Sequence, residues 1–421
     1  MIQEKEYEAR RLKLSKKLDA NSLTILFSAE YQTRSNDTEY PFRQNSNFYY
    51  LTGFKEDKSV LLIVKKAKKS KFILFVEKKD KTKELWNGKR LGAKLAKDKF
   101  LVDEVYEIQD LITQVKALAT KSKKIYHDLN DKRVENLKKE LPNITSFQSV
   151  ISFIEEQRLI KSSQEIKLIK KAIQITKDAH HYAMTHAKAL SYEFELQAGI
   201  EYVFKKNGAY SDAYTSIVAC GNAANTLHYI ANNQALIPKK LILIDAGCEY
   251  DYYASDITRT IPVDGKFTKP QQEVYDMVLA VQLKILAMIK PGIKRTALQK
   301  KAIKLLTQGM IDLKILTKSL KTCIKKELYK KYYPHGIGHW MGIDVHDECP
   351  YKNKNGKEIP LKKGMVLTIE PGIYLDTEDK KIPKKYRGIG IRIEDDILVT
   401  KDGSLNLSQD IAKTIQEIES F

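Results

Sequence analysis

Residues 334–347 read Pro-His-Gly-Ile-Gly-His-Trp-Met-Gly-Ile-Asp-Val-His-Asp and hold three of the eight histidines in this 421-residue chain. These histidines are His335, His339 and His346. The three glycines of the stretch permit close backbone approach and argue against a regular helix. A single histidine is commonly a core or surface residue. Three of them in a glycine-rich loop indicate a functional site.

Two aspartates lie upstream of this loop. Asp245 follows the apolar run 241–244, and Asp256 lies within Tyr-Ala-Ser-Asp-Ile-Thr-Arg-Thr at 253–260. We expect Asp245 to end a strand and Asp256 to lie inside the next one, which would bring the two carboxylates together on a hairpin. Either aspartate alone has a structural explanation, as a turn residue or as a charge on a strand edge.

Two glutamates lie downstream of the loop. Glu370 closes the apolar run 365–369 and is followed by Pro-Gly, which turns the chain. Arg392 and Glu394 stand two residues apart in Gly-Ile-Arg-Ile-Glu-Asp-Asp at 390–396. Because side chains alternate along a strand, we expect both of them on one face of a strand.

Together these motifs supply four carboxylates and one imidazole, from Asp245, Asp256, His339, Glu370 and Glu394. Hard oxygen donors in this number suit two divalent ions of the Mn²⁺, Co²⁺ or Mg²⁺ kind better than one tetrahedral zinc ion. Four negative charges also balance two dications. A water bridging such ions would lose a proton near neutral pH and become a nucleophile.

The chain resembles the pita-bread metallopeptidases, and within them the Xaa-Pro aminopeptidases (aminopeptidase P), over nearly its whole length. In the C-terminal half the resemblance rests on Asp-Ala-Gly at 245–247, Ser-Asp-Ile-Thr-Arg-Thr at 255–260, the histidine loop, Thr-Ile-Glu-Pro-Gly-Ile-Tyr at 368–374 and Gly-Ile-Arg-Ile-Glu-Asp at 390–395. In the N-terminal half it rests on residues 33–54, TRSNDTEYPFRQNSNFYYLTGF, which resemble the family's non-catalytic domain. Met341 is a small departure from the family's branched aliphatic residue.

The resemblance implies a metal-binding role for each of the five residues. Asp245 would bind one ion, Asp256 and Glu394 would bridge both ions, and His339 with Glu370 would complete the other site. Glu370 would also act as general base and return its proton to the leaving nitrogen.

Further residues match positions of the family around the metals. His228 and His346 resemble histidines that bind substrate and stabilise the oxyanion of the tetrahedral intermediate. His335 matches another active-site histidine, and Arg392 matches an arginine that holds the carboxylates. Tyr374 stands where the family has a tyrosine near the metals, and we assign it to substrate binding.

Trp86, within Leu-Trp-Asn-Gly-Lys-Arg-Leu-Gly at 85–92, is the one site candidate in the first half of the chain. The resemblance implies that it binds substrate beyond proline, in its own subunit or in a neighbouring one. The alternative is that this tryptophan belongs partly to the core.

The sequence predicts two domains of mixed α/β (α+β) class. Residues 1–158 are expected to form an aminopeptidase P-type α/β domain, with a helix at 4–18 and strands at 22–27, 59–64 and 72–76. Residues 159–421 are expected to form the pita-bread catalytic domain. Its longer helices are predicted at 162–187, 192–207, 270–290 and 295–312, and Ser162 or Ser163 can cap the first of them.

The charge balance is strongly basic, with 73 Lys and Arg against 53 Asp and Glu and a formal net charge of +20. The excess is lysine in scattered doublets, without the arginine and aromatic interleaving of a base-stacking surface, so we expect no specific nucleic-acid binding. No apolar run reaches the roughly 18 residues that span a bilayer, so we expect a cytoplasmic protein without a membrane partner. The resemblance implies a homodimer or homotetramer.

The predicted function is therefore a metal-dependent exopeptidase, most consistent with Mn²⁺, that removes the N-terminal residue from Xaa-Pro peptides. The bond before proline is a tertiary amide without an N–H, so its cleavage needs only a polarised carbonyl, a nucleophile and a proton donor for the ring nitrogen. The nearest alternative is prolidase, which shares the fold and the ligands but cleaves dipeptides. A more distant alternative is a non-enzymatic pita-bread protein that binds nucleic acid.

Overall fold

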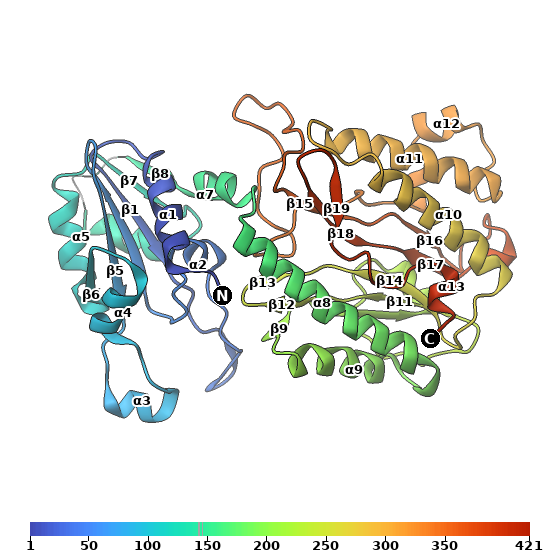
Figure 1. Cartoon of the computed structure of the whole chain (residues 1–421), viewed down its shortest axis with the longest axis horizontal. Coiled ribbons are helices and arrows are strands. Elements are labelled where there is room, and N and C mark those ends of the chain that lie inside the picture. Colours follow the sequence, from blue (N-terminus) through green and yellow to red (C-terminus); the bar gives the residue numbers. More distant parts are fainter. Residues whose placement is uncertain (142–143, 145) are drawn as a thin grey trace. The chain divides into compact units, whose positions relative to one another are not determined.

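The computed structural model describes residues 1–141, 144 and 146–421. The chain divides into two compact units, Met1–Gln157 and Arg158–Phe421 (Figure 1). No helix in the described ranges is long and apolar enough to cross a membrane.

The first unit is built on a six-stranded sheet of order β6-β5-β4-β1-β7-β8. Its strands are β1 (Ser22–Phe27), β4 (Val60–Lys65), β5 (Ser70–Val76), β6 (Glu104–Glu107), β7 (Lys124–His127) and β8 (Phe147–Ser149), and a separate hairpin consists of β2 (Thr33–Ser35) and β3 (Thr38–Glu39). The β1–β4 and β4–β5 pairs are antiparallel, whereas β1–β7, β5–β6 and β7–β8 are parallel. The sheet is therefore mixed, as expected for an α/β domain.

The helices of the first unit are α1 (Glu4–Ser15), α2 (Ser46–Thr52), α3 (Lys81–Asn87), α4 (Gly92–Phe100), α5 (Leu111–Ala119), α6 (Arg133–Lys139) and α7 (Ile151–Arg158). The apolar face of α5, with Leu111 and Val115, packs on alternate residues of the central strands, such as Leu23, Ile25 and Leu62. Helix α3 differs from the others because none of its residues is buried.

The second unit contains several short sheets. Its strands are β9 (Ser211–Asp212), β10 (Ile217–Cys220), β11 (Leu241–Asp245), β12 (Cys248–Tyr250), β13 (Tyr253–Ala254), β14 (Thr258–Pro262), β15 (Val366–Ile369), β16 (Gly372–Leu375), β17 (Ile389–Arg392), β18 (Asp395–Val399) and β19 (Ser404–Asn406). They pair in the orders β10-β11-β14, β13-β12-β9, β15-β18-β19 and β16-β17. The two halves of this unit thus supply two groups of strands, one before and one after the long helices α10 and α11.

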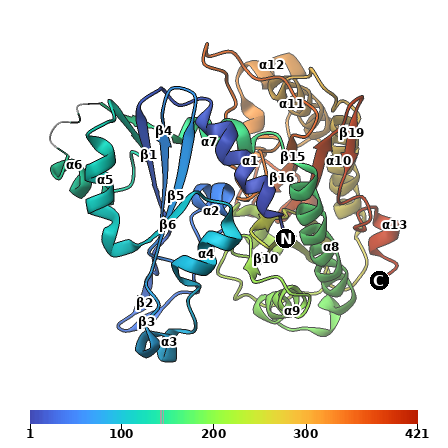
Figure 2. The same cartoon turned by 60° about the vertical axis from the view of Figure 1, so that its left-hand side comes forward.

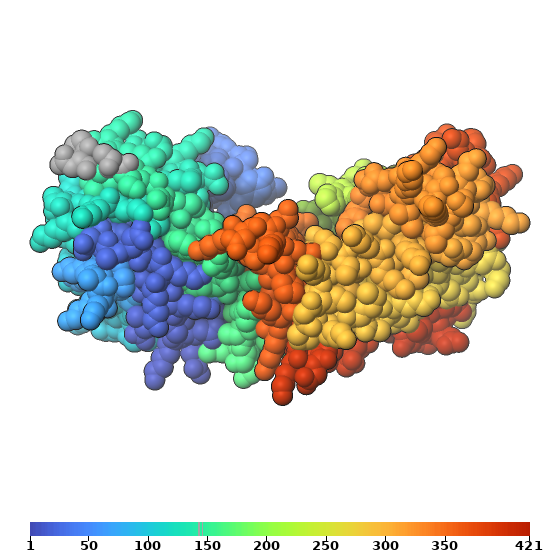
Figure 3. All heavy atoms as spheres, turned by 90° about the horizontal axis from the view of Figure 1, so that it is seen from above, coloured from blue at the N-terminus to red at the C-terminus, as the bar shows by residue number. Residues whose placement is uncertain are grey.

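The helices of the second unit lie on one side of these strands (Figures 1 and 2). They are α8 (Ser163–His186), α9 (Glu193–Lys206), α10 (Lys269–Leu286), α11 (Arg295–Asp312), α12 (Leu320–Lys325) and α13 (Ile415–Ile418). Helices α8 and α9 pack against β10, β12 and β13, and α10 packs against β15, β16 and β17. Helices α11 and α12 form part of the outer surface of the unit (Figure 3). The covered face is the core, and the opposite face is left for the site.

Most of the predicted elements are confirmed. The predicted helices 4–18, 162–187, 192–207, 270–290 and 295–312 correspond to α1, α8, α9, α10 and α11, with ends that differ by a few residues. Ser162 caps α8 in a full capping box, because its hydroxyl accepts from Glu165 N while Glu165 accepts from Ser162 N.

Two local predictions are wrong. Asp256 does not lie inside a strand but two residues before β14, because the β12–β13 hairpin is inserted between Asp245 and Asp256. Glu394 does not share a strand with Arg392, because β17 ends at Arg392 and β18 begins at Asp395. The chain changes partner at this point, from β16 to β15, and Glu394 N donates to Thr258 O at 3.1 Å in the break.

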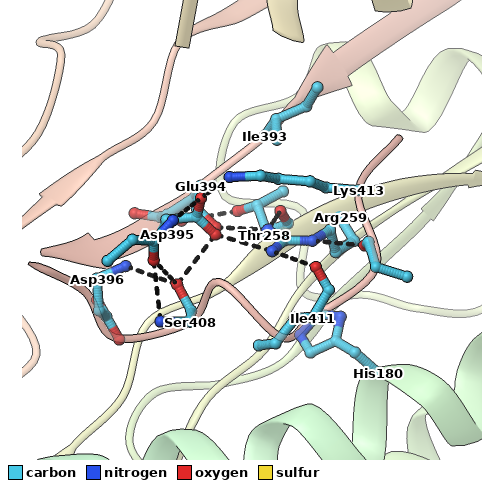
Figure 4. A network of polar contacts seen from close by, with 12 residues as sticks. His180, Thr258, Arg259, Ile393, Glu394, Asp395, Asp396, Ser408, Ile411 and Lys413 are labelled. Atoms are coloured by element: carbon cyan, nitrogen blue, oxygen red, sulfur yellow. Dashed lines mark hydrogen bonds and ion pairs between the residues drawn. The ribbon is translucent and has the colours of Figure 1, made fainter. Parts of the chain in front are cut away.

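A buried ionic network fastens this break to β14 and to the C-terminal segment (Figure 4). Arg259 and Asp395 are both fully buried, with a 2.8 Å contact between Nη2 and Oδ1. Arg259 also donates to Glu394 O at 2.6 Å, and Lys413 forms a second ion pair with Asp395. Burial alone would raise the pKa of Asp395, but the two cations outweigh it and lower the pKa to about 2.

We predict that Asp395→Asn destabilises the protein by about 3–5 kcal/mol at pH 7, because it leaves the Arg259 charge buried without its carboxylate. The folded pKa lies below the unfolded value of roughly 3.9, so this stabilisation is complete above about pH 4 and is lost as the pH falls toward 2. Urea unfolding of both proteins between pH 3 and 7 measures the difference.

The matched control is Glu327→Gln, which breaks the exposed pair with Lys330 and should cost less than about 1 kcal/mol. If the difference in free energy of unfolding between the wild type and Asp395→Asn does not shrink below pH 4, the destabilisation does not come from the loss of this charge.

Candidate metal centre

The four predicted carboxylates stand where strands end or break. Asp245 is the last residue of β11, and Glu370 directly follows β15. Asp256 precedes β14, and Glu394 occupies the break between β17 and β18. Strand pairing therefore fixes the backbone next to each carboxylate while leaving the side chain free to point into the site.

The histidine loop reaches the same place by running along β15. Thr368 N donates to His339 O and Glu370 N donates to Ile337 O, both at 2.9 Å. A Cβ on Gly338 would lie 1.9 Å from Thr368 O, so this close approach requires glycine. The loop thus behaves as an irregular edge strand that presents His339 beside Glu370.

Buried charges hold the far end of the loop. Lys161 Nζ lies 2.8 Å from Asp347 Oδ2, and Arg158 forms ion pairs with both Asp344 and Asp347. Lys161, Arg158 and Asp347 are each at most 5% exposed. Burial alone would raise the pKa of Asp347, but Lys161 and Arg158 hold it well below its usual range. This end of the loop, which carries His346, is thereby fixed to the segment before α8.

The structure brings all five predicted ligands together. Ligand atoms of Asp245, Asp256 and Glu394 lie within 4.8 Å of one another, and so do those of His339, Glu370 and Glu394. His339 Nε2 lies 3.2 Å from Asp256 Oδ2 and 3.9 Å from Glu370 Oε1. Glu394 belongs to both groups. The donor atoms therefore form two adjacent clusters that share Glu394, and Asp256, His339 and His346 form a third overlapping group.

The electrostatics of the cluster call for added positive charge. Burial raises the pKa of Glu370 to about 7, and burial together with the neighbouring carboxylates raises the pKa of Glu394 well above its usual range. Burial would lower the pKa of His339, but Asp256 and Glu370 raise it to about 9. Hard oxygen donors with an excess of negative charge fit a pair of divalent metal ions.

The histidine is oriented to act as a ligand. His339 Nδ1 contacts Trp340 O at 3.0 Å, which places the proton on Nδ1. The other nitrogen, Nε2, faces the carboxylates, and it could bind a metal ion there once that ion displaced the proton that the high pKa keeps on Nε2. A backbone carbonyl on the second ring nitrogen is the usual support of a metal-binding histidine.

Arg392 connects several of the predicted residues. Its guanidinium donates to Asp245 Oδ2 at 2.5 Å, to Tyr374 OH at 2.9 Å and to Thr258 Oγ1 at 3.0 Å. Thr258 Oγ1 in turn donates to Glu394 Oε2 at 2.8 Å. Arg392 is only 4% exposed, so these contacts form in a dry environment and fix two carboxylates at once.

His335 joins this group through Tyr374. Burial, with Arg392 nearby, lowers the pKa of His335 to about 4, so the ring is neutral at pH 7. Nδ1 contacts Gly336 O at 2.8 Å, and Nε2 contacts Tyr374 OH at 2.9 Å. Nδ1 therefore carries the proton, and Tyr374 donates its hydroxyl hydrogen to His335 while accepting from Arg392.

A cavity of about 680 Å³ opens above these groups. Its polar lining includes all five predicted ligands together with Arg392, His228, His335 and His346. The His339 and His346 rings lie 4.1 Å apart. An apolar wall consists of Ile217, Leu227, Ile230 and Val345, with Tyr351 beside it. The predicted residues of the second unit thus share one cavity, with Tyr374 directly behind it.

Trp86 lies elsewhere, in the first unit on α3, and is 81% exposed. Its neighbour Leu85 is 82% exposed. The alternative that Trp86 is a core residue is therefore wrong for this chain.

Sequence reasoning missed two residues that contact the predicted ligands. Tyr214 OH donates to Asp245 Oδ1 at 2.6 Å, and Thr258 contacts Glu394 and Arg392. Thr258 belongs to the stretch 253–260 that the sequence analysis singled out, and it is the first residue of β14, two residues after Asp256. Nothing local marks Tyr214, which is 31 residues from its partner.

Two family models match the chain. Metallopeptidase family M24 matches residues 167–401, and the N-terminal domain of aminopeptidase P matches residues 7–126. The chain therefore belongs to metallopeptidase family M24, with an aminopeptidase P N-terminal domain. This confirms the predicted mixed α/β fold with its pita-bread catalytic half.

Relatives over the full length narrow the class further. The Xaa-Pro aminopeptidase of Haemophilus influenzae is 39% identical over 100% of this chain and 97% of its own, and that of Escherichia coli is 36% identical over 100% and 98%. Solved structures of E. coli aminopeptidase P, one with the inhibitor Pro-Leu and one zinc-substituted with product, match with a TM-score of 0.96 at 35% identity and cover 100% of this chain and 98% of theirs. Within family M24, the chain is thus a metal-dependent exopeptidase of the Xaa-Pro aminopeptidase group, and the prolidase and non-enzymatic alternatives are disfavoured.

We predict that Arg392→Lys lowers kcat/KM about 10- to 100-fold and weakens metal retention. Lysine keeps the charge but cannot contact Asp245, Tyr374 and Thr258 at once. Steady-state kinetics and elemental analysis of the purified variant measure the two effects.

Arg387→Lys is the control, because among the described residues the Arg387 guanidinium donates to just two groups, the backbone carbonyls of Ile382 and Lys380, and it does not line the cavity. Equal kinetics of Arg392→Lys and the wild type would show that the guanidinium geometry is not required.

Proposed function

We propose that this protein removes the N-terminal residue from peptides whose second residue is proline, and that it uses two Mn²⁺ ions. Asp245, Asp256, His339, Glu370 and Glu394 would hold the ions. The observation that carries the proposal is the two clusters of ligand atoms that share Glu394 at the floor of a cavity lined by three further histidines. When bound, the ions would polarise the scissile carbonyl and lower the pKa of water.

Glu370 is the general base in this proposal. Its carboxylate is enclosed near His335 Nδ1, at 3.5 Å, and near His339 Nε2, at 3.9 Å. It accepts a proton from the attacking water and passes that proton to the proline nitrogen as the peptide bond breaks. Proline's nitrogen has no hydrogen of its own, so the departing ring depends on this donated proton.

The remaining polar residues orient substrate and charge. His228 and His346 line the cavity with exposed rings, which suits donation to the peptide and to the oxygen that becomes negative in the tetrahedral intermediate. Neutral His335, Tyr374 and Arg392 form a fixed chain of hydrogen bonds that keeps Asp245 in place. The apolar wall of Ile217, Leu227, Ile230 and Val345 suits an uncharged side chain or a proline ring.

Several predictions about the setting of the enzyme stay proposals. Residues 1–158 would serve as the non-catalytic domain, and residues 159–421 would carry the catalysis. The enzyme would be a cytoplasmic homodimer or homotetramer, without specific nucleic-acid binding. Trp86 would bind substrate residues beyond proline, which its exposed position on α3 supports.

We predict that prolonged chelation abolishes Xaa-Pro hydrolysis and that Mn²⁺ restores it, because the cluster supplies donors but no polarising charge of its own. In the same assay, Asp256→Asn should lower kcat/KM by more than about 100-fold and lower the metal content, since it removes one negative charge from the shared cluster. Kinetics and elemental analysis are the measurements.

Asp264→Asn is the matched control, because Asp264 is exposed at a turn after β14. Full activity after verified removal of metal would contradict the mechanism, and an Asp256→Asn variant with normal metal content and rate would exclude Asp256 from the cluster.

A separate prediction distinguishes an aminopeptidase from a dipeptidase. Trp86→Ala should reduce kcat/KM for Xaa-Pro-Xaa peptides about ten- to a hundredfold, and should affect Xaa-Pro dipeptides less, because a dipeptide ends at proline and offers Trp86 nothing to contact. Steady-state kinetics on both substrate lengths measure the ratio.

Leu85→Ala is the control, since Leu85 is the equally exposed neighbour of Trp86. Equal losses on both substrate lengths would remove Trp86 from the substrate site, and cleavage of dipeptides alone would favour prolidase.

A further inference from the structure

The position of His228 is not fixed by contacts of its own ring. Across the described residues, the ring makes no hydrogen bond, and His228 lies in the segment 226–238, which contains neither helix nor strand. Yet His228, Leu227 and Ile230 all line the cavity. The backbone of this segment therefore decides where the imidazole lies.

The segment is tied down by one buried carboxylate, that of Glu193. Glu193 is the first residue of α9 and is 0% exposed. Its carboxylate accepts from Cys220 N at 2.6 Å, from Tyr229 OH at 2.8 Å and from Gln234 N at 2.9 Å. Glu193 N also donates to Gln234 O at 3.0 Å. These contacts bracket His228 on both sides, and one of them is to the residue next to it.

The chemistry of Glu193 suits this task. A buried carboxylate is costly unless hydrogen bonds satisfy it, and no cation pairs with Glu193 in the part of the chain that the structure describes. The positive end of the α9 dipole and three donors stabilise its charge instead. Burial and the bond to Glu193 raise the pKa of Tyr229 to about 12, so this phenol keeps its proton and donates it. All three donors belong to the end of β10 or to the segment that carries His228.

A second anchor, Asn232, joins the segment beyond His228 to β10, but it makes no contact with the residue next to His228. Asn232 is 1% exposed with a φ of 44°, a left-handed conformation that asparagine tolerates better than most residues. Its side chain accepts from Val218 N at 2.9 Å and donates to Ser216 O at 2.7 Å. Asn232 therefore fixes the return of the chain to β10, and Glu193 fixes the part that bears the histidine.

We propose that Glu193 is a positioning residue for catalysis, whose carboxylate holds His228 over the metal centre. The inference rests on the proposed function of His228. It assigns to a residue outside the cavity the task of keeping an otherwise unsupported imidazole in its working position.

The test is Glu193→Gln in the full-length, metal-loaded enzyme. The amide keeps the shape of the side chain, but its NH₂ group cannot accept, so at least one of the three donors loses its partner. We expect kcat/KM for an Xaa-Pro-Xaa peptide to fall about 10- to 100-fold, with the metal content unchanged. We also expect faster hydrogen–deuterium exchange in peptides that cover residues 226–236.

Glu165→Gln is the matched control. Glu165 is also a buried glutamate in the first turn of a helix, α8, and it accepts from Tyr253 OH at 3.0 Å, but it does not line the cavity. Its substitution should leave exchange in residues 226–236 at the wild-type rate. If Glu193→Gln does not fold, Tyr229→Phe removes a single donor and should give the same local increase in exchange.

A double-mutant cycle with His228→Ala separates the two claims. If Glu193 acts through His228, adding Glu193→Gln to His228→Ala should cause little further loss of kcat/KM. The inference would be overturned if Glu193→Gln lowered kcat/KM by the same factor in the His228→Ala background as in the wild type. Unchanged hydrogen–deuterium exchange in residues 226–236 would also overturn it. Wild-type turnover by His228→Ala alone would instead contradict the proposed function at His228.

Discussion

Mutual repulsion among four closely spaced carboxylates, two of them buried and two half-buried, is the constraint around which the second unit is arranged. Asp256 and Glu394 are 4% and 2% exposed, and their charges cannot be relieved by solvent. Within the described residues, Arg392 is the one arginine or lysine that pairs with a carboxylate of the cluster, through Asp245. One guanidinium does not balance the charge of four carboxylates. The remaining negative charge favours the binding of divalent cations in the cavity.

Such a cluster pushes itself apart unless the backbone around it is stiff. Each carboxylate lies next to a paired strand, which fixes its backbone. Buried ion pairs stabilise the break at Glu394, where no strand contains the residue. Glu394, which no strand contains, has its carbonyl held by Arg259, and Arg259 is locked by Asp395. The Arg158–Asp347–Lys161 group does the same for the histidine loop. Buried ion pairs outside the cavity thus help to fix the positions of the charged residues that line it.

Local sequence indicates which residues of the second unit gather in one cavity, and it says little about the contacts that surround them. His339 and Glu370 could be predicted because a glycine-rich loop and a strand followed by Pro-Gly each leave a local pattern, and the family resemblance supplied the role of Asp245 and Asp256. The break at Glu394 could not be predicted, since it results from β17 and β18 choosing different partners. Tyr214 and Glu193 contact residues 27–41 positions away along the chain, and no local pattern indicates such contacts.

The two sides of the cavity are built differently: paired strands support the predicted metal ligands, and the loop segment 226–238 forms the side with His228. Metal ligands can be placed by strands, because the ions do not have to pass through them. On the other side, His228 and Ile230 line the cavity from a segment that contains neither helix nor strand. Rigidity on that side has to come from buried polar anchors beneath the segment. A carboxylate at a helix N-terminus is well suited to this, since it satisfies several backbone and side-chain donors from below and occupies no space in the cavity.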